Sequence, residues 1–298
     1  MNQARIIDGR TEAAKIRAAV RESVSVLVRD HGLVPGLAVV LVGDNSASRV
    51  YVRTKTRHAE DAGIKSFGYT LPPETTERDL LLLLDELNAR EDVHGILVQL
   101  PLPSQIKAER VLERIDPRKD VDGFHPYNAG RLAIGKPTLV PCTPRGCVLL
   151  SKTVHSSLRG LEVVILGRSI IVGRPAAQLF LAEDCTTTIA HSGTRDVAKV
   201  ARRADVLVAA VGRAQLVTAE WIKPGATVID VGINRIQGDG TGNRIVGDVD
   251  FQSASRVAGA ITPVPGGVGP MTVALLLENT VQCAREQLAI RQRRGVVA

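Results

Sequence analysis

Short apolar runs alternate with longer amphipathic stretches along the first half of this chain. Residues 37–42 and 95–100 are dominated by Val, Leu and Ile, whereas residues 11–29 mix apolar and polar positions at helical spacing. Continuous apolar runs of this length are typical of strands buried on both faces, as in a parallel sheet with helices above and below it. The pattern therefore predicts an α/β fold.

The alternation breaks between residues 101 and 144, where turn-forming residues are frequent, and it resumes from residue 161. The later apolar runs occupy residues 163–166, 186–189, 205–211 and 226–231. Short strands separated by segments of helical length predict a Rossmann-type, doubly wound parallel sheet in this half. The turn-rich segment is the predicted connection between two domains.

A strongly helical pattern fills residues 271–294, after a Gly-Gly-Val-Gly-Pro turn. We expect this C-terminal helix to return to the first domain. The predicted architecture is two α/β domains flanking a cleft. One domain comprises residues 1–143 with 267–298, and the other, the doubly wound sheet, comprises residues 144–266.

The composition is that of an ordinary globular protein. The chain has 298 residues, of which 44% are hydrophobic and 23% charged, and no apolar run approaches the roughly 18 to 20 residues that span a bilayer. Charges in the first ten residues interrupt the apolar segment that a secretory signal needs, which predicts a cytoplasmic protein. The four cysteines form no C-x-x-C pair, so we expect reduced thiols rather than a metal or redox site.

The net charge of +7 favours an anionic partner: a phosphorylated cofactor, a polycarboxylate substrate or a nucleic acid. The chain contains only four Phe, three Tyr and one Trp, and they are scattered. The stacking platforms of a single-strand binder are therefore missing, and no nucleic-acid motif is present. Neither nucleic acid nor membrane is a predicted partner.

A glycine turn follows the first predicted strand of the second domain. Gly167 and Gly173 flank this turn, which a helical segment follows. Such a turn lets backbone N–H groups and a helix N-terminus face a phosphate, although the spacing is not G-x-G-x-x-G and an ordinary strand-to-helix turn is the alternative.

The end of the next strand indicates which dinucleotide the turn would take. NAD-selective domains place an acidic residue there to bind the ribose, but residues 191–195 read His-Ser-Gly-Thr-Arg. The Ser192 hydroxyl and the Arg168 guanidinium can instead hold a 2′-phosphate. The sequence therefore predicts NADP rather than NAD.

Tyr51 and Lys55 are four residues apart in a helical segment, so they share one face. If this face borders a cleft, the ring can stack on a flat heterocycle while the amine relays a proton or activates water. The alternative is a surface lysine beside a half-buried tyrosine.

Two further polar residues stand near the ends of predicted elements. Gln99 interrupts an apolar strand, where a buried amide needs partners, and it is well placed to hold Lys55. Asp122 lies in a turn where its carboxylate can accept two hydrogen bonds from the edge of an amino-heterocycle. Asp before Gly is also an ordinary turn signal.

These motifs together resemble the bifunctional methylenetetrahydrofolate dehydrogenase/methenyltetrahydrofolate cyclohydrolase family (FolD type) over essentially the whole chain. The matching stretches are residues 47–55, 95–103, 119–124, 141–146, 167–175, 228–234, 246–249 and 261–272. The last of them contains Pro-Gly-Gly-Val-Gly-Pro-Met-Thr, which is highly specific.

The resemblance implies oxidation of 5,10-methylene-tetrahydrofolate with NADP, followed by hydrolysis of the methenyl product to 10-formyl-tetrahydrofolate, in the service of purine, methionine and histidine biosynthesis. In the carried-over roles, Lys55 activates water or relays the proton, Gln99 orients Lys55, Tyr51 stacks on the folate, and Asp122 grips the pterin edge. The implied substrate-binding set adds Val52, Val98, Leu100, Pro265, Gly266, Gly267, Val268 and Gly269. The implied cofactor-binding set is Gly167, Arg168, Ser169, Ser192 and Ile233.

The resemblance also implies a homodimer formed through the cofactor domains and no metal. One departure is Gly193, which stands where a basic residue often follows the serine and leaves the 2′-phosphate one cation short; Arg195 or Arg174 can compensate. Two alternatives are kept: a monofunctional dehydrogenase, and a non-catalytic dinucleotide or folate sensor.

Overall fold

The computed structural model describes residues 3–136, 138–237 and 243–295, and it divides into two compact units. The six-stranded unit comprises Met1–Ala13, Leu132–Lys136 and Pro141–Thr272, and the three-stranded unit comprises the rest of the chain. Both units are α/β, as the alternation of apolar and amphipathic segments predicted. No helix among the described residues is long and apolar enough to cross a membrane.

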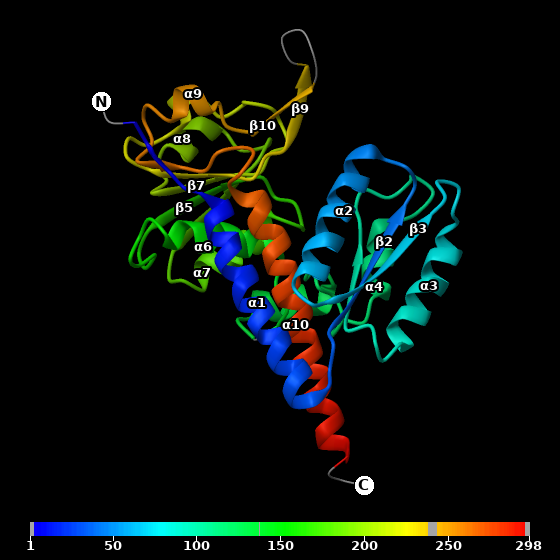
Figure 1. Cartoon of the computed structure of the whole chain (residues 1–298). Helices are drawn as coiled ribbons and strands as arrows, with labels where there is room; N and C mark the ends of the chain where they lie inside the picture. The colour runs from blue at the N-terminus through cyan, green and yellow to red at the C-terminus, as the bar shows by residue number, and fades with distance from the viewer. Residues whose placement is uncertain (1–2, 137, 238–242, 296–298) are drawn as a thin grey trace. The chain divides into compact units, whose positions relative to one another are not determined.

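The three-stranded unit is a parallel sheet in the order β3 (Lys65–Leu71), β2 (Gly36–Val42), β4 (Gly95–Val98). Every residue of the central strand β2 is buried, which explains its unbroken apolar run. The helices α2 (Ser46–Asp61) and α3 (Glu77–Ala89) lie on opposite sides of the strands (Figure 1). Two shorter helices, α4 (Ala108–Arg114) and α5 (Pro126–Ala133), follow β4.

Helix α3 shows how the local sequence builds this unit. Its buried Leu80, Leu84 and Leu87 recur at helical spacing and pack in the same core as Val40 of β2. The hydroxyl of Thr76 accepts a hydrogen bond from the Asp79 backbone N–H and caps the first turn.

The six-stranded unit is a parallel sheet whose strand order places β5 between β6 and β7. The order is β1 (Arg5–Ile6), β11 (Ala260–Ile261), β8 (Thr227–Asp230), β7 (Val206–Ala209), β5 (Glu162–Leu166), β6 (Thr186–Ala190). Its helices are α6 (Cys142–Lys152), α7 (Gly173–Leu181), α8 (Val197–Ala201) and α9 (Phe251–Ala254), with a 3-10 turn at Ala219–Trp221. The chain leaves β5 toward β6 and then crosses to β7, which confirms the predicted doubly wound arrangement.

An antiparallel hairpin, β9 (Asn234–Gln237) with β10 (Asn243–Val246), extends from this unit (Figure 1). The sequence pattern did not predict it, because each strand has four residues and little apolar alternation.

The unit boundaries differ from the predicted domain boundaries at both ends of the chain. Residues 1–13 belong to the six-stranded unit, because the two-residue strand β1 pairs in parallel with β11. The N-terminal helix α1 (Gly9–His31) and the C-terminal helix α10 (Val268–Gly295) each begin in that unit and continue in the three-stranded unit, which α10 enters at Val273. The expected return of the last helix is thus confirmed, with its start three residues earlier than the pattern indicated.

Candidate active site

Lys55 and Gln99 meet in the three-stranded unit, although 44 residues separate them in the chain. The Lys55 Nζ donates a hydrogen bond of 3.0 Å to Oε1 of Gln99. The Gln99 Nε2 donates to the carbonyl of Leu100 at 2.7 Å, so the carboxamide oxygen is the atom that faces the amine. Gln99 follows β4 directly, and its backbone N–H donates to the Val40 carbonyl of β2. The sheet therefore fixes the residue that orients the lysine.

On α2 the lysine is buried and the tyrosine is exposed, which is the opposite of a surface lysine beside a half-buried tyrosine. Lys55 is only 8% exposed, whereas Tyr51, one turn earlier, is 37% exposed. Burying an ammonium group is unfavourable unless hydrogen bonds replace its water. The interpretation of Lys55 as an ordinary surface lysine is wrong, and the pair with Gln99 predicted from the sequence is present.

Asp122 lies half-buried in a turn that is held from several sides. The Gly123 N–H donates to the Asp120 carbonyl and closes the turn, and Gly123 has a φ of 72°, which favours glycine. The buried carboxylate of Asp120 accepts from the backbone N–H of Gly123 and of His125, and from Nδ2 of Asn128. Asp120, and not Asp122, therefore accepts the hydrogen bonds that hold the turn.

Two residues whose roles sequence reasoning missed support the same turn. The buried Lys119 Nζ donates to the carbonyls of Leu87, Asn88 and Arg90 and so satisfies the C-terminal end of α3. The Asn279 Nδ2, on α10, donates 2.8 Å to the Val121 carbonyl. Asn279 lies 158 residues from its acceptor, so no local signal could have indicated the contact.

Burial raises the pKa of Asp122 to about 6, and the negative charge of Asp120 contributes to the rise while the nearby Lys55 ammonium opposes it. An acid with a pKa in this range changes charge near neutral pH. Lys55, Gln99 and Asp122 therefore place an amine, a carboxamide and a carboxyl group that titrates near neutral pH within one compact unit.

The other predicted substrate residues divide into accessible and buried positions. The side chain of Val98 is 2% exposed and packs in the core under α3, so substrate binding by Val98 stays a prediction and would have to use its backbone. All four residues of β4 are buried, and the Val98 side chain lies on the face of the sheet that α3 covers. Val52 and Leu100 are half-buried.

The Pro265–Gly269 segment belongs to the six-stranded unit and forms the turn that leads into α10, whose first two residues are Val268 and Gly269. The Gly267 N–H donates to the Pro263 carbonyl at 2.8 Å. A Cβ on Gly9, at the start of α1, would lie 1.8 Å from the Gly267 carbonyl oxygen. Gly266, Gly267 and Val268 are buried, whereas Pro265 is exposed to solvent at the beginning of the segment.

The predicted phosphate turn between β5 and α7 has the tight geometry that only glycine permits. Gly167 has a φ of 115°, and a Cβ there would lie 2.1 Å from the Ala210 carbonyl oxygen. A Cβ on Gly173 would lie 2.1 Å from the Gly167 carbonyl oxygen. The Ser169 Oγ accepts from the N–H groups of Val172 and Gly173, which closes the turn at the N-terminus of α7. The turn fits a dinucleotide pyrophosphate.

Arg168 and Ser192, the predicted 2′-phosphate residues, are both exposed. The Arg174 Nε donates to the Arg168 carbonyl, so this second guanidinium is tied to the backbone of the turn. His191 shapes the next loop, because its Nδ1 accepts from the Gly193 N–H at 3.1 Å and leaves Ser192 at the surface. Ile233 is 49% exposed in the loop after β8.

Two buried carboxylates, which sequence reasoning did not single out, hold the loops on either side of Ile233. Asp230 accepts from the N–H groups of Gly232, Asp248 and Val249. Asp248 in turn accepts from the N–H groups of Val211 and Gly212 and from the Asn234 Nδ2. Burial raises the pKa of Asp230 to about 7 against these hydrogen bonds. The available signal was an acidic residue at the end of an apolar strand.

A metal site needs several His, Cys, Asp or Glu side chains close enough together to bind one ion. Among residues 3–136, 138–237 and 243–295, no group of three or more His, Cys, Asp or Glu side chains is placed to hold a metal ion.

Comparison with known proteins matches both halves of the chain. The model of the tetrahydrofolate dehydrogenase/cyclohydrolase catalytic domain matches residues 7–122, and that of the corresponding NAD(P)-binding domain matches residues 141–288. The bifunctional protein FolD of Paramagnetospirillum magneticum is 58% identical over 287 residues, which cover 96% of this chain and 97% of that protein.

Solved structures agree with these matches. The FolD enzyme of Campylobacter jejuni has a TM-score of 0.90 at 45% identity and covers 94% of this chain and 98% of its own. The Trypanosoma brucei enzyme, solved with NADP and an inhibitor, has a TM-score of 0.92 at 41% identity, with coverage of 97% and 99%. The chain therefore belongs to the tetrahydrofolate dehydrogenase/cyclohydrolase family.

Proposed function

We propose that this protein is a bifunctional methylenetetrahydrofolate dehydrogenase and methenyltetrahydrofolate cyclohydrolase that uses NADP. It oxidises 5,10-methylene-tetrahydrofolate to the methenyl compound and hydrolyses that compound to 10-formyl-tetrahydrofolate. The buried Lys55–Gln99 pair, in a chain of this family, is the observation that carries the proposal. NADP, when bound, supplies the hydride acceptor of the first reaction.

Lys55 serves the hydrolytic reaction as the group that moves a proton to or from the attacking water. One hydrogen on its Nζ is donated to Oε1 of Gln99, and this hydrogen bond orients the other hydrogens of the amine. A positioned amine of this kind is typical of general acid–base catalysis. Gln99 acts on Lys55 rather than on the substrate, so we assign it as a positioning residue.

Asp122 and Tyr51 bind the folate in this proposal. The half-buried carboxylate of Asp122 accepts hydrogen bonds from the amino edge of the pterin, and charge-assisted hydrogen bonds of this kind are stronger than neutral ones. The exposed ring of Tyr51 offers a flat surface for an aromatic part of the substrate.

Folate affinity is expected to fall as the pH falls through about 6, because Asp122 must be ionised to accept both hydrogen bonds. Because the pKa of Asp122 is raised from 3.8 to about 6, the loss of affinity occurs at a higher pH than an ordinary aspartate would give. At pH 5 the ionised fraction of Asp122 is about one tenth. Calorimetric titration with folic acid from pH 5 to 8 measures this dependence. Asp122→Asn should flatten the profile and the surface variant Asp61→Asn should leave it unchanged; a wild-type profile that is flat above pH 5 contradicts the assignment.

The six-stranded unit holds NADP at the glycine turn and the loop after β6. Gly167, Ser169 and Gly173 shape the turn that receives the pyrophosphate, and Arg168 and Ser192 bind the 2′-phosphate. Ile233 contributes an exposed apolar surface, and the carboxylates of Asp230 and Asp248 fix the loops that carry it.

Arg168→Gln is expected to lower the preference for NADP over NAD by a factor of about 10 to 100, since a hydrogen bond to a charged group contributes about 1.5 to 3 kcal/mol. The ratio of kcat/KM for the two cofactors measures the change. Arg256→Gln, which removes another exposed arginine of the same unit, should keep the wild-type ratio. An unchanged ratio in Arg168→Gln removes this residue from the 2′-phosphate site.

Turnover of 5,10-methylene-tetrahydrofolate tests the proposed function directly. Nicotinamide reduction and methenyl accumulation are followed at separate wavelengths, with NADP and with NAD. Reduction of NADP with little accumulated methenyl compound is the expected result. Accumulation of the methenyl compound indicates a monofunctional dehydrogenase, and absence of turnover indicates a non-catalytic sensor.

We also infer that the protein is a cytoplasmic homodimer acting in one-carbon metabolism that supplies purine, methionine and histidine biosynthesis. The edge strand β6 supports the dimer, because an edge offers free backbone groups and Ile189 on it is 37% exposed. The four cysteines are unpaired thiols, as is usual in the cytoplasm. Light scattering should give twice the 31.8 kDa of one chain.

A further inference from the structure

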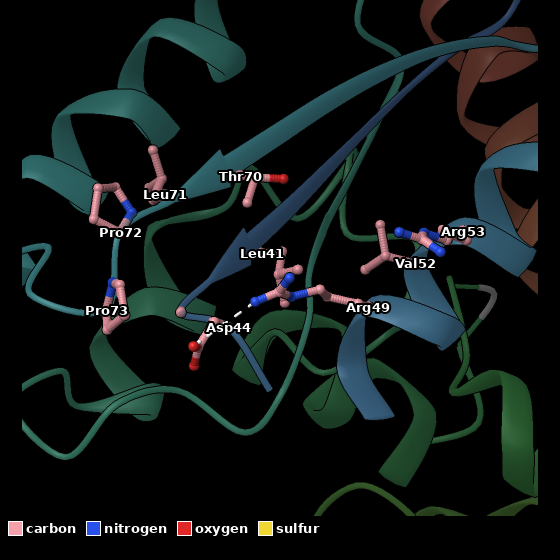
Figure 2. A pocket seen from close by; sticks show the side chains of 10 residues that line it. Leu41, Asp44, Arg49, Val52, Arg53, Thr70, Leu71, Pro72 and Pro73 are labelled. Carbon is pink, nitrogen blue, oxygen red and sulfur yellow. Dashed lines mark ion pairs between the residues drawn. The ribbon is translucent and has the colours of Figure 1, made fainter. Parts of the chain in front are cut away.

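The carboxylates at the carboxyl edges of the two sheets differ in burial. In the three-stranded unit this edge opens into a cavity of about 460 Å³, which Arg49 and Arg53 help to line (Figure 2). The carboxylate there, Asp44, has a side chain that is 79% exposed, and its 3.8 Å ion pair with Arg49 contributes little to stability. In the six-stranded unit, Asp230 is 3% exposed and Asp248 is fully buried. Burying a charge is unfavourable unless hydrogen bonds compensate it, so the contacts of these two residues are informative.

Asp230, the last residue of β8, holds the segment that carries Asp248. Its Oδ1 accepts hydrogen bonds of 2.9 Å from the N–H groups of Gly232 and Asp248, and its Oδ2 accepts one of 3.0 Å from Val249. A Cβ on Gly247 would collide with that Oδ2, so a glycine is needed for this close approach. Asp230 therefore fixes the backbone from which the second carboxylate extends.

Asp248 joins two loops that follow neighbouring strands. Its Oδ2 accepts hydrogen bonds from the N–H groups of Val211, at 2.6 Å, and Gly212, at 2.9 Å, in the loop after β7. Its Oδ1 accepts one of 2.8 Å from Nδ2 of Asn234, which follows the exposed Ile233 in the loop after β8. Hydrogen bonds to a charged acceptor are stronger than neutral ones. One side chain therefore holds the loop after β7 and the loop after β8 together.

The loop after β7 also lies against the glycine turn that is proposed to receive the pyrophosphate. A Cβ on Gly167 would collide with the carbonyl oxygen of Ala210, and the Ala210 N–H donates to the Leu166 carbonyl at 2.8 Å. In the sheet, β6 lies on one side of β5, and β7 and β8 lie on the other. A dinucleotide with its pyrophosphate at the glycine turn and its 2′-phosphate at the loop after β6 therefore extends its other half over the loops after β7 and β8.

We propose that Asp248 is a positioning residue for the nicotinamide half of NADP; this inference rests on the proposed function. Asp248 is fully buried, so it acts through the two loops that it joins and not by contact with the cofactor. Oxidation requires the nicotinamide to be held close to the carbon that loses the hydride, so displaced loops slow this reaction. Hydrolysis of the methenyl compound consumes only water, and the adenosine half lies at β5 and β6. Neither depends on Asp248.

Two substitutions and a matched control isolate this role. Asp248→Asn keeps the size of the side chain, but a carboxamide has one oxygen, so an NH2 group faces either the two backbone N–H groups or Asn234. The exchange Asp248→Asn/Asn234→Asp restores both contacts, because the new carboxamide accepts from the backbone and donates to the new carboxylate. Asp250→Asn, two residues further along the chain and just before α9, is the control.

Binding and rate measurements on these variants test the proposal. In Asp248→Asn, NADP affinity and the rate of methylene-tetrahydrofolate oxidation should each fall by a factor of about 10 to 100, as expected when hydrogen bonds to a charged group are lost. Adenosine 2′,5′-bisphosphate, which has the 2′-phosphate but no nicotinamide, should bind in calorimetry as it binds the wild type. Hydrolysis of the methenyl compound without dinucleotide should keep its rate. The exchange variant should recover most of the NADP affinity and oxidation rate, and Asp250→Asn should retain both.

Equal losses of affinity for NADP and for adenosine 2′,5′-bisphosphate in Asp248→Asn would overturn the proposal, because they would indicate a general role in the fold of the unit. An unchanged oxidation rate in Asp248→Asn, or an exchange variant as impaired as Asp248→Asn, would overturn it as well. Absence of NADP reduction by the wild type would count against the proposed function, while the two binding titrations would still decide the role of Asp248.

Discussion

Replacing Lys55 by methionine should slow methenyl-tetrahydrofolate hydrolysis by a factor of about 10² to 10⁴, the usual contribution of a positioned acid or base. Methionine is similar in length to lysine but carries no proton, so it fills the 8% exposed position without the amine. The variant also removes the hydrogen bond to Gln99. NADP affinity should stay within about twofold, because Lys55 and the glycine turn belong to different compact units.

Single-turnover hydrolysis of the methenyl compound measures the rate, and fluorescence titration measures NADP affinity. Lys65→Met is the matched control, since Lys65 is an exposed lysine of the same unit. Gln99→Leu should lower the rate less than Lys55→Met and shift its pH profile, because it leaves the amine in place without its acceptor. Hydrolysis at the wild-type rate in Lys55→Met would show that another group moves the proton.

Gly173→Ala should abolish measurable NADP binding or weaken it at least a hundredfold. The added Cβ would lie 2.1 Å from the Gly167 carbonyl oxygen and 3.0 Å from the Arg168 Cα, and both are backbone atoms that cannot rotate away. The turn must therefore move, and overpacking of this kind costs about 1 to 3 kcal/mol of stability. Fluorescence titration with NADP and thermal unfolding measure the two effects.

Gly130→Ala provides the control for this variant. Gly130 also lies in a helix, α5, but a Cβ there would meet nothing within 4 Å. Alanine is the better helix former, so we expect unchanged NADP affinity and equal or slightly higher stability. If Gly173→Ala bound NADP with wild-type affinity, the glycine turn would not be the pyrophosphate site.

Sequence reasoning could select candidate site residues, but it could not describe their surroundings. The four-residue spacing of Tyr51 and Lys55 and the polar Gln99 in an apolar strand were readable, and the structure brings Lys55 and Gln99 together. Their burial was not readable, because exposure depends on which elements cover a helix face. Val98 shows the same limit, since its motif indicated a binding residue while its strand position places the side chain in the core.

The supporting contacts needed the folded chain. Asp230 and Asp248 stand in recognisable motifs, but only the structure shows that their carboxylates collect backbone N–H groups from separate loops. The cavity of Arg49 and Arg53 was equally hidden, because its other wall comes from the end of β3 and the prolines that follow it.

The sequence by itself determined the α/β class, the doubly wound second half and the glycine turn. These depend on local periodicity and on backbone conformations that only glycine adopts, and both are properties of neighbouring residues. The tertiary structure decided where the N-terminal strand pairs, which carboxylates are buried and which atoms meet Lys55. Those outcomes depend on contacts between distant segments, such as the pairing of Arg5 with Ala260 and the hydrogen bond from Asn279 to Val121, which no local pattern encodes.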